Sequence, residues 1–256
     1  MNTKGVINHI ETWLKSYLVK SGCKGFVVGV SGGIDSAVTS TLCARTGFPL
    51  IVVNIPIFQP SAQYERSKEH IAWLKSNFIS VQEEEINLTD SFKSISVVLP
   101  QSVQDELTMA NVRSRMRMLT LYAFAGHYRY LVVGTGNKVE DFGVGFFTKY
   151  GDGGVDLSPI ADLSKTEVYI LAKELGIVQS IQQAKPTDGL WDDDRSDEDQ
   201  LGATYPELEW VMGFSGDESL LNEREREVLA IYRRLNKANK HKMIPIPVCH
   251  IPPELK

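Results

Sequence analysis

The segment at residues 31–36, Ser-Gly-Gly-Ile-Asp-Ser, has the residue types and the setting of a phosphate-binding loop. It follows a short apolar run and precedes a helical pattern. A strand, a glycine turn and a helix N-terminus form an anion site, because backbone N–H groups point at the ligand and the helix dipole favours negative charge. The glycines let the backbone approach phosphate oxygens closely, and the serines can add hydroxyl donors.

Two common phosphate loops do not match this turn. A Walker loop requires GxxxxGK[ST] and a dinucleotide loop requires GxGxxG, and the turn has neither pattern. The pattern SGGxDS instead resembles the PP-loop of the N-type ATP pyrophosphatases, which cleave ATP between its α and β phosphates. The resemblance implies that residues 29–36 cradle the pyrophosphate. It also implies that Asp35 binds Mg²⁺, a cation that prefers carboxylate and phosphate oxygens.

A second glycine turn, residues 134–140 with the sequence GTGNKVE, follows another apolar run. Ligands of open parallel sheets bind at the carboxyl ends of the strands, so this turn is expected to face the same crevice as the first. Further motifs follow it: GFFTKYGDGG at 145–154, DLSPIADLSKTEV at 156–168 and KPT at 185–187. With NVRSRMR at 111–117 and the pair His241-Lys242, they resemble the NAD synthetase family from about residue 25 to about residue 245.

The resemblance implies a reaction. The family amidates nicotinic acid adenine dinucleotide (deamido-NAD) to NAD, using ATP, Mg²⁺ and a nitrogen donor. The nicotinate carboxylate attacks the α-phosphate, pyrophosphate leaves, and ammonia displaces AMP from the acyl adenylate. Two alternatives stay open: another PP-loop adenylating ligase, and a non-catalytic nucleotide-binding module.

The resemblance also assigns roles to single positions. The residues expected to carry catalysis are Asp35, Glu140 and Lys165, of which Asp35 and Glu140 are the expected metal ligands. Those expected to bind ATP are Gly29, Val30, Ser31, Gly32, Gly33, Ile34, Asp35, Ser36, Thr135, Lys165 and Thr187. Those expected to bind deamido-NAD are Arg115, Lys149, Asp156, His241 and Lys242. Plain structural alternatives exist; His241 and Lys242, for example, could serve only as cations at the end of a long helix.

The elements that must position these residues follow from periodicity. Continuous β-branched runs at 26–30, 50–55 and 130–134 favour parallel strands buried on both faces, with a weaker strand within 79–88. Helical patterns occupy residues 36–45, 61–78, 105–125, 164–175 and 217–240, and Ser164 with Glu167 forms a capping box. The alternation predicts an α/β fold: an open twisted parallel sheet with helices on both faces. The resemblance implies its Rossmann-like, adenine nucleotide alpha hydrolase-like form.

The resemblance also bears on the domains and on the nitrogen source. We expect a single domain over residues 1–256. Because the PP-loop begins near residue 30, we expect no glutaminase domain and free ammonia as the donor. The glycine loop at 143–154 and the acidic segment at 188–199 are expected to act as lids that keep water from the acyl adenylate. The acidic segment could equally be a solvated surface loop.

Composition excludes several other classes of protein. The 256 residues include 43% hydrophobic and 23% charged side chains, which is globular composition. The net charge of −5 argues against nucleic acid as a partner, and the three cysteines form no CxxC pair. The N-terminal segment predicts an amphipathic helix rather than an export signal, and apolar runs are too short to span a membrane. We therefore expect a cytoplasmic location.

The resemblance further implies a homodimer with the deamido-NAD site at the subunit interface. The pattern at residues 105–125 supports this with two apolar faces. One is the clear apolar stripe of Met109, Val112, Met116, Leu119 and Ala123. The other contains Met118, Leu121, Tyr122 and Phe124. One face could meet a partner subunit, although the N-terminal helix could cover the same surface within one chain.

Overall fold

A computed structural model describes residues 1–187, 189 and 196–256 of the chain. Its strands are β1 (Phe26–Gly29), β2 (Leu50–Asn54), β3 (Val81–Glu85) and β4 (Leu131–Val132). Its α-helices among the described residues are α1 (Thr3–Ser21), α2 (Ile34–Arg45), α3 (Ser61–Asn77), α4 (Thr89–Val98), α5 (Glu106–Tyr128), α6 (Lys165–Glu174), α7 (Gln179–Gln182), α8 (Asp197–Leu201), α9 (Tyr205–Gly213) and α10 (Glu223–Met243). A π-helical turn spans Val139–Val144, and 3₁₀ turns span Gln101–Val103, Glu218–Leu220 and Pro253–Leu255.

The four strands form one parallel sheet in the order β3-β2-β1-β4. Phe26 in β1 lies opposite Leu50 on one side and Leu131 on the other. The chain moves from β1 toward β2 and β3, and β4 then adds to the opposite edge of β1. Strand order therefore reverses at β1, and the crevice at such a switch point is where ligands bind in open α/β sheets.

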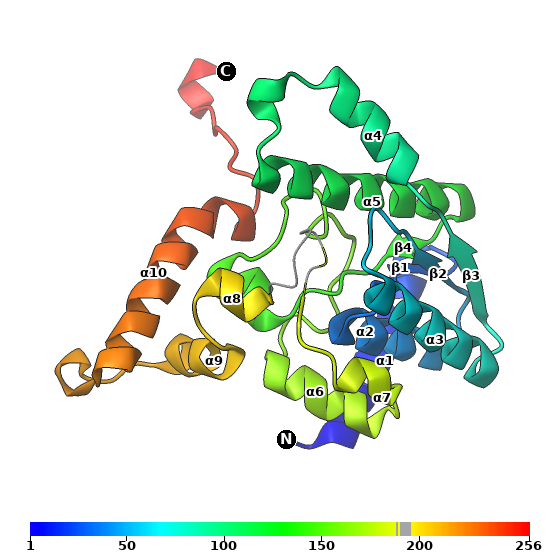
Figure 1. The fold of residues 1–256 in the computed structure, drawn as a ribbon, viewed down its shortest axis with the longest axis horizontal. Coiled ribbons are helices and arrows are strands. Elements are labelled where there is room, and N and C mark those ends of the chain that lie inside the picture. Colours follow the sequence, from blue (N-terminus) through cyan, green and yellow to red (C-terminus); the bar gives the residue numbers. More distant parts are fainter. Residues whose placement is uncertain (188, 190–195) are drawn as a thin grey trace.

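Each strand alternates its side chains between two apolar layers. Val27 and Ile51 pack with Ala125 of α5 on one face. Phe26 and Val28 pack on the other face with α1, α2 and α6. Figure 1 shows α5 on one side of the sheet and α2 and α3 on the other. Burial on both faces explains why the strand sequences are continuously apolar, and the predicted α/β fold is confirmed.

A second apolar cluster lies beyond the sheet. The π-helical turn, α8, α9 and α10 bury Val139, Leu208 and Val228 together with neighbouring side chains. The π-helical turn contacts both α9 and α10, and α9 also contacts α6. This cluster supports the segment that follows β4, and that segment carries Glu140.

Helix α5 does not bury the whole of the stripe that its sequence predicts. Met109 and Met116 pack against Phe92 of α4, but Leu119 is 68% exposed. Over its second half the helix instead turns Leu121 toward the sheet. The predicted apolar stripe is therefore only partly buried, because α5 packs on α4 first and on the sheet afterwards.

The N-terminal helix does not cover α5. Ile7, Leu14 and Leu18 of α1 belong to the cluster on the other face of the sheet, and α1 contacts α2 and α6. The alternative in which α1 shields the second face of α5 is therefore wrong. The exposed side of α5, including Leu119, is open on the surface of the chain.

Some helix boundaries also differ from the sequence prediction. The last helix begins at Glu223 rather than 217, because Asn222 caps it and Glu225 completes a capping box. Helix α9 was not predicted, although Thr204 and Glu207 form the same box ahead of it. The expected acidic lid at 188–199 lies partly outside the described residues, and its end forms α8 behind the cap Ser196.

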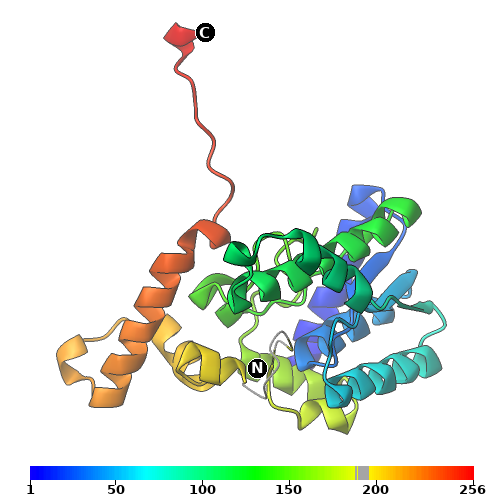
Figure 2. The same ribbon diagram turned by 45° about the horizontal axis from the view of Figure 1, so that its top comes forward.

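After α10 the chain leaves the body as an extended arm that ends at residue 256 (Figure 2). Pro245 and Pro247, at the beginning of this arm, prevent α10 from continuing. None of the described helices combines the length and the apolar character that crossing a bilayer requires.

A buried histidine makes the stability of the fold depend on pH. His70 of α3 lies with its Nε2 3.0 Å from the Ser40 hydroxyl, and its ring stacks on Trp73. Burial lowers the pKa of His70 from 6.5 to about 4. The unfolded chain therefore binds this proton more readily, and stability falls as pH drops from 6.5 toward 4, by about 1.4 kcal/mol per pH unit.

We expect His70→Phe to flatten this dependence, since a phenyl ring keeps the stacking and cannot titrate. The Ser40 hydroxyl retains the Ser36 and Ala37 carbonyl oxygens as acceptors. Urea unfolding at pH 7.5, 6 and 5 measures the effect. The exposed His9 supplies the control variant His9→Phe. Parallel pH profiles for wild type and His70→Phe would contradict the assignment.

Candidate active site

The loop between β1 and α2 leaves its N–H groups available to a ligand. Gly33 is the N-cap of α2 and supplies no capping side chain, so the first-turn donors lack that partner. Gly32 has a φ of +84°, and a Cβ at this position would lie 2.3 Å from the Gln63 carbonyl oxygen. Only glycine therefore fits there, and the loop has the form of an anion site.

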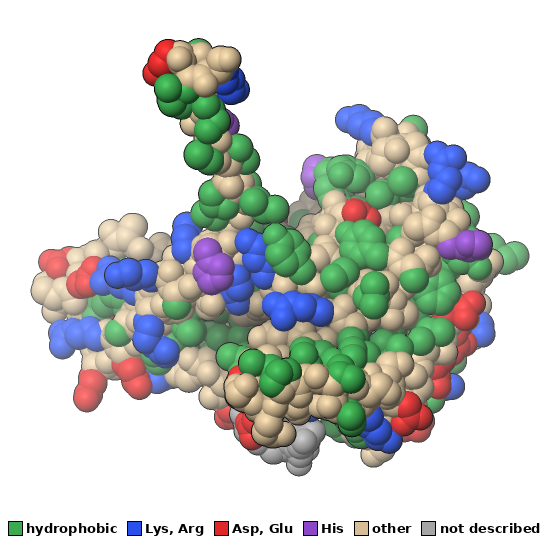
Figure 3. Space-filling view, turned by 90° about the horizontal axis from the view of Figure 1, so that it is seen from above, with side chains coloured by type: hydrophobic (Ala, Val, Ile, Leu, Met, Phe, Trp, Pro, Cys, Tyr) green, Lys and Arg blue, Asp and Glu red, His purple; other side chains and the backbone are tan. Residues whose placement is uncertain are grey.

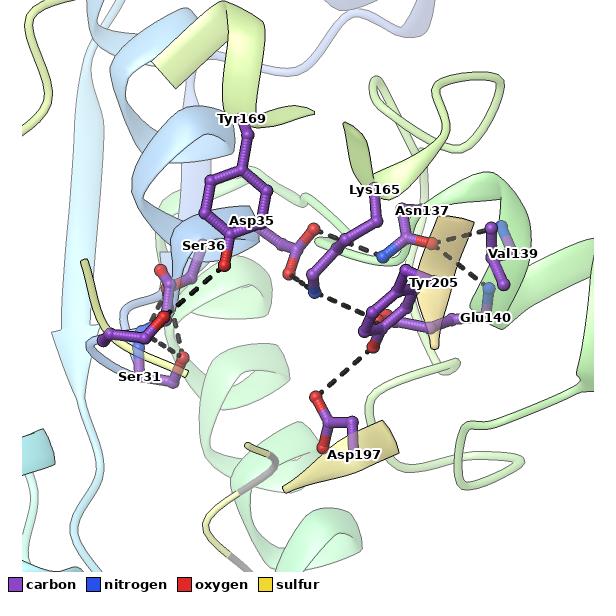
Figure 4. A network of polar contacts seen from close by, with 12 residues as sticks. Ser31, Asp35, Ser36, Asn137, Val139, Glu140, Lys165, Tyr169, Asp197 and Tyr205 are labelled. Atoms are coloured by element: carbon purple, nitrogen blue, oxygen red, sulfur yellow. Dashed lines mark hydrogen bonds and ion pairs between the residues drawn. The ribbon is translucent and has the colours of Figure 1, made fainter. Parts of the chain in front are cut away.

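The two serines of this loop brace it. The Ser36 hydroxyl donates to the Gly33 carbonyl oxygen at 3.0 Å and accepts from the Ser31 N–H at 3.2 Å. The Gly33 N–H in turn donates to the Ser31 hydroxyl oxygen. Figure 4 shows these contacts at one end of the site. The hydroxyls expected to meet phosphate are thus already used in holding the loop's shape.

A buried cation joins the two carboxylates that the sequence predicts as metal ligands. Lys165 Nζ lies 2.5 Å from Asp35 Oδ2 and 3.1 Å from Glu140 Oε1. Burial alone would lower the pKa of Lys165, but the charges of Asp35 and Glu140 outweigh it and hold that pKa above its usual range. Lys165 is 3% exposed, and its ammonium is satisfied by the two acids (Figure 4). This arrangement explains why a cation follows the N-cap of α6, where the helix dipole disfavours it.

Asn137 aligns the second glycine turn with the first. Its amide nitrogen donates to Asp35 Oδ1 at 3.3 Å. Its amide oxygen accepts from the N–H groups of Val139 and Glu140. The fully buried Asn137 thus links the end of β4 to the start of α2. The predicted meeting of the two turns in one crevice is confirmed.

Two residues of the cluster were missed by sequence reasoning. The Tyr205 hydroxyl donates to Glu140 Oε1 at 2.6 Å and lies 3.3 Å from Asp197 Oδ2. Burial, with Glu140 and Asp197 nearby, raises the pKa of Tyr205, so its hydroxyl stays protonated and remains a donor. Lys165 Nζ lies 4.7 Å from the ring centroid of Tyr205. Their places at the start of α9 and α8 carry no motif that predicts this.

The site opens into a cavity of about 620 Å³, a size suited to a nucleotide. Among the predicted residues, those that line it are Gly29, Val30, Ser31, Gly32, Gly33, Ile34, Asp35, Ser36, Thr135, Glu140, Lys165, Thr187, His241 and Lys242. Unpredicted charged residues in the same wall are Arg66, Arg117, Asp141, Asp152, Lys185 and Asp197. Burial raises the pKa of Asp141 to about 8, and the adjacent Glu140 adds to the effect. The wall therefore mixes both signs of charge.

Predicted substrate residues gather at one end of this cavity. Lys149 Nζ donates to the His241 carbonyl oxygen at 3.0 Å, and Lys242 Nζ donates to that of Phe147 at 2.7 Å. Arg115 Nε reaches the Lys149 carbonyl oxygen at 3.3 Å. Arg115 and Lys149 thus flank the cavity without lining it. Figure 3 shows basic side chains gathered at the foot of the C-terminal arm.

None of these four basic residues lies within ion-pair distance of an acid in the described part of the chain. Each of the three long side chains is held by a backbone carbonyl instead. Carbonyl oxygens position a cation but do not neutralise it. The positive charge of these three side chains is therefore available to a bound anion.

Asp156 is placed differently from the other predicted substrate residues. Its carboxylate accepts from the Tyr122 hydroxyl at 3.0 Å and from the Val132 N–H at 2.8 Å. It does not line the cavity. In the structure this carboxylate fastens the chain after the glycine loop to β4 and α5.

Comparison with known proteins places the chain in a family. The model of the family described as NAD synthase matches residues 6–245. The chain belongs to the NAD synthase family. A relative from Syntrophomonas wolfei, named NH(3)-dependent NAD(+) synthetase, is 35% identical, and the match covers 100% of both chains.

Solved structures of an NMN synthetase and of an NAD synthetase share the fold. The structure of an NMN synthetase from Francisella tularensis superposes with a TM-score of 0.86 at 28% identity, covering 98% of this chain and 100% of that one. An NH3-dependent NAD synthetase from Campylobacter jejuni gives a TM-score of 0.79 at 23% identity, with the same coverage. The second likeness bears on the fold alone.

The donor set of this NAD synthase fits a hard divalent cation. Asp35 and Glu140 both contact Lys165 Nζ, so their carboxylates lie close together. The described residues contain no cluster of three metal-binding side chains. Magnesium sites at phosphates use one or two carboxylates and take their other ligands from phosphate and water. Two carboxylates beside a phosphate loop match that pattern.

We expect Lys165→Met to destabilise the protein by about 3–5 kcal/mol, because Asp35 and Glu140 would face each other without a cation. The matched control is Lys138→Met, since Lys138 pairs with Asp162 at the surface and should change stability by less than about 1 kcal/mol. Urea unfolding measures both. Adding Asp35→Asn to Lys165→Met should recover part of the loss. Equal losses for the two lysine variants would contradict the role of Lys165.

Proposed function

We propose that this chain catalyses the ATP-dependent amidation of deamido-NAD to NAD, with ammonia as the nitrogen donor and AMP and pyrophosphate as the other products. One observation carries the proposal. A single cavity joins the phosphate loop and the Asp35–Lys165–Glu140 cluster to His241 and Lys242, which have no acid within ion-pair distance among the described residues. Membership in the NAD synthase family supports the same reaction.

The first step needs two anions to meet. A carboxylate oxygen of nicotinate attacks the α-phosphorus, the bond from that phosphorus to the bridging oxygen breaks, and pyrophosphate leaves with the electron pair. The loop N–H groups would hold the phosphates, and Lys165 would offset their charge. A magnesium ion held by Asp35 and Glu140 would supply further positive charge at the phosphates.

The second step is displacement at the carbonyl carbon. Ammonia forms the new C–N bond, AMP leaves with the electrons of the C–O bond, and a proton is released from nitrogen. The substrate's own carboxylate is the nucleophile of the first step, so no side-chain nucleophile is required. The protein's contribution is to position the reactants and exclude water.

The glycine loop at 143–154 is attached to α5 in a way that suits the exclusion of water from the site. Thr148 Oγ1 donates to Asn111 Oδ1 at 2.6 Å, and Ser114 Oγ donates to Asp152 Oδ1 at 2.6 Å. Tyr150, in the same loop, has a φ of 62°, which costs a non-glycine residue energy. A strained and tightly bonded loop over the cavity fits a cover for a water-sensitive intermediate.

A second candidate product is NMN, made from the corresponding mononucleotide acid. The likeness to the Francisella tularensis NMN synthetase favours it. The two candidates differ in substrate length, since the dinucleotide carries an additional adenylate. Arg115 lies outside the cavity wall and is exposed. We expect it to contact only the longer substrate.

Purified protein with ATP, Mg²⁺ and ammonium should convert deamido-NAD to NAD and release one AMP and one pyrophosphate for each NAD formed. Glutamine free of ammonia should support little turnover.

Asp35→Asn keeps the shape and removes a charge, so we expect the rate to fall by at least about 100-fold. Chromatographic separation of the nucleotides measures NAD formation with ammonium, with glutamine and with Asp35→Asn. Near-normal turnover of Asp35→Asn at saturating Mg²⁺ would remove Asp35 from the mechanism.

The same assay with the mononucleotide acid decides between the two products. We expect the larger kcat/KM with deamido-NAD. A larger kcat/KM with the mononucleotide acid would make NMN the product, while leaving the adenylation chemistry in place.

We also propose that the chain acts as a homodimer with the site at the subunit interface. The face of α5 that carries the exposed Leu119 is not covered by α1, and Arg115 lies one turn before Leu119 on the same helix. In a two-fold dimer, both copies of such a helix lie near the axis. Arg115 would then reach a dinucleotide bound mainly by the other subunit.

The dimer should have a mass near twice 28.6 kDa by light scattering. Arg115→Ala should weaken deamido-NAD binding far more than ATP binding. Mixing Arg115→Ala with Asp35→Asn protein should restore activity, because one composite site in each heterodimer is intact. A fully active monomer would refute the shared site, and failure to restore activity after verified subunit exchange would place Arg115 in its own subunit's pocket.

A further inference from the structure

Helix α3 forms a second wall beside the phosphate loop. The Gln59 amide, just before the helix, donates to the Ser31 carbonyl oxygen at 3.0 Å. Arg66 Nε donates to the Gly32 carbonyl oxygen at 3.3 Å. Both side chains, together with Gln63, line the cavity. The loop is therefore flanked by a guanidinium that comes from a different element than the loop or Lys165.

Arg66 differs from the other cations of α3 in its partners. Lys68 pairs with Glu85 at 3.6 Å, and Lys75 pairs with Glu83 at 2.8 Å. Both face solvent. Arg66 has no acid within ion-pair distance in the described part of the chain, and its bond to Gly32 uses only Nε. The one cavity-facing cation of α3 among the described residues is thus also the one left without a counter-charge.

The setting of Arg66 makes that missing counter-charge significant. The side chain is half-buried, and burial lowers its pKa without taking the charge away at neutral pH. A desolvated guanidinium is costly unless an anion neutralises it. Its two terminal nitrogens make no hydrogen bond within the described structure, and that planar pair suits bidentate contact with phosphate.

We infer that Arg66 binds the phosphate groups seated on the loop, and therefore the pyrophosphate that leaves during adenylation. The inference rests on the proposed ATP-dependent function and adds a residue that the family resemblance does not assign. As the bond at the α-phosphorus breaks, negative charge grows on the bridging oxygen of pyrophosphate. A guanidinium already anchored through Gly32 can stabilise this charge without reorganising.

The test compares inorganic pyrophosphate with AMP as ligands of the whole protein in the presence of Mg²⁺. Arg66→Met keeps the stem and removes the charge, and it should raise the Kd of pyrophosphate about 10- to 100-fold. The Kd of AMP, which lacks the β and γ phosphates, should change by less than about 3-fold. Isothermal titration calorimetry measures both. Lys68→Met is the matched control on the same helix and should leave both Kd values unchanged.

Arg66→Lys controls for a purely structural effect, because it keeps the positive charge and removes the planar pair of guanidinium donors. We expect it to fold as the wild type does, by thermal unfolding, and to bind pyrophosphate with an affinity between wild type and Arg66→Met. An unchanged Kd for pyrophosphate in both Arg66 variants overturns the inference. So does an equal loss of pyrophosphate and AMP binding, which would show that Arg66 only braces the loop.

The outcome separates this inference from the proposed function. If pyrophosphate binding depends on Arg66 but the wild type forms no amide product, the inference stands and the function fails. If the wild type forms NAD and both Arg66 variants are inhibited by pyrophosphate as strongly as the wild type, the function stands and the inference fails.

Discussion

The buried ion cluster at Lys165 is the constraint on which the rest of the site depends. Its ammonium contacts carboxylates that lie 130 and 25 positions away in sequence, on α2 and on the turn after β4. Charges this deeply buried are tolerated only when their geometry is satisfied. The sheet order places β4 beside β1, and this adjacency brings Asp35 and Glu140 to a common point. A change in strand order would leave each charge buried alone.

The cluster also explains how a site for highly charged ligands can exist before they bind. The carboxylates of Asp35 and Glu140 outnumber the single ammonium that they contact, so this ion cluster carries excess negative charge. That balance suits arrival of a divalent cation with phosphates. Positive charge for the ligands is held apart, at Arg66 on α3 and at Lys242 near the end of α10. Neither Arg66 nor Lys242 lies within ion-pair distance of an acid among the described residues.

Two packing units cooperate to hold these walls. The apolar layers on the sheet position the phosphate loop, while the cluster of α8, α9 and α10 supports the turn that carries Glu140. Tyr205 connects the two, since its ring packs in the second cluster and lies 4.7 Å from Lys165 Nζ on α6, while its hydroxyl bonds to Glu140. Movement of α9 would therefore shift the hydrogen bond to the Glu140 carboxylate, and this bond couples the C-terminal helices to the active site.

The sequence by itself determined the parts that local patterns encode. The strands are continuous apolar runs, and the PP-loop is a contiguous motif. The capping box of α6 is formed by Ser164 and Glu167, which are only three positions apart. Only the tertiary structure decided the rest. The face of α5 that is buried depends on which surfaces it crosses, and the roles of Tyr205 and Arg66 depend on neighbours far away in the chain. The hydrogen bonds of Asp156 to Tyr122 and to β4 likewise follow from the fold, and its binding of substrate stays a prediction. Propensity and spacing act within one element, whereas charge pairing and burial are set by contacts between elements that the fold alone brings together.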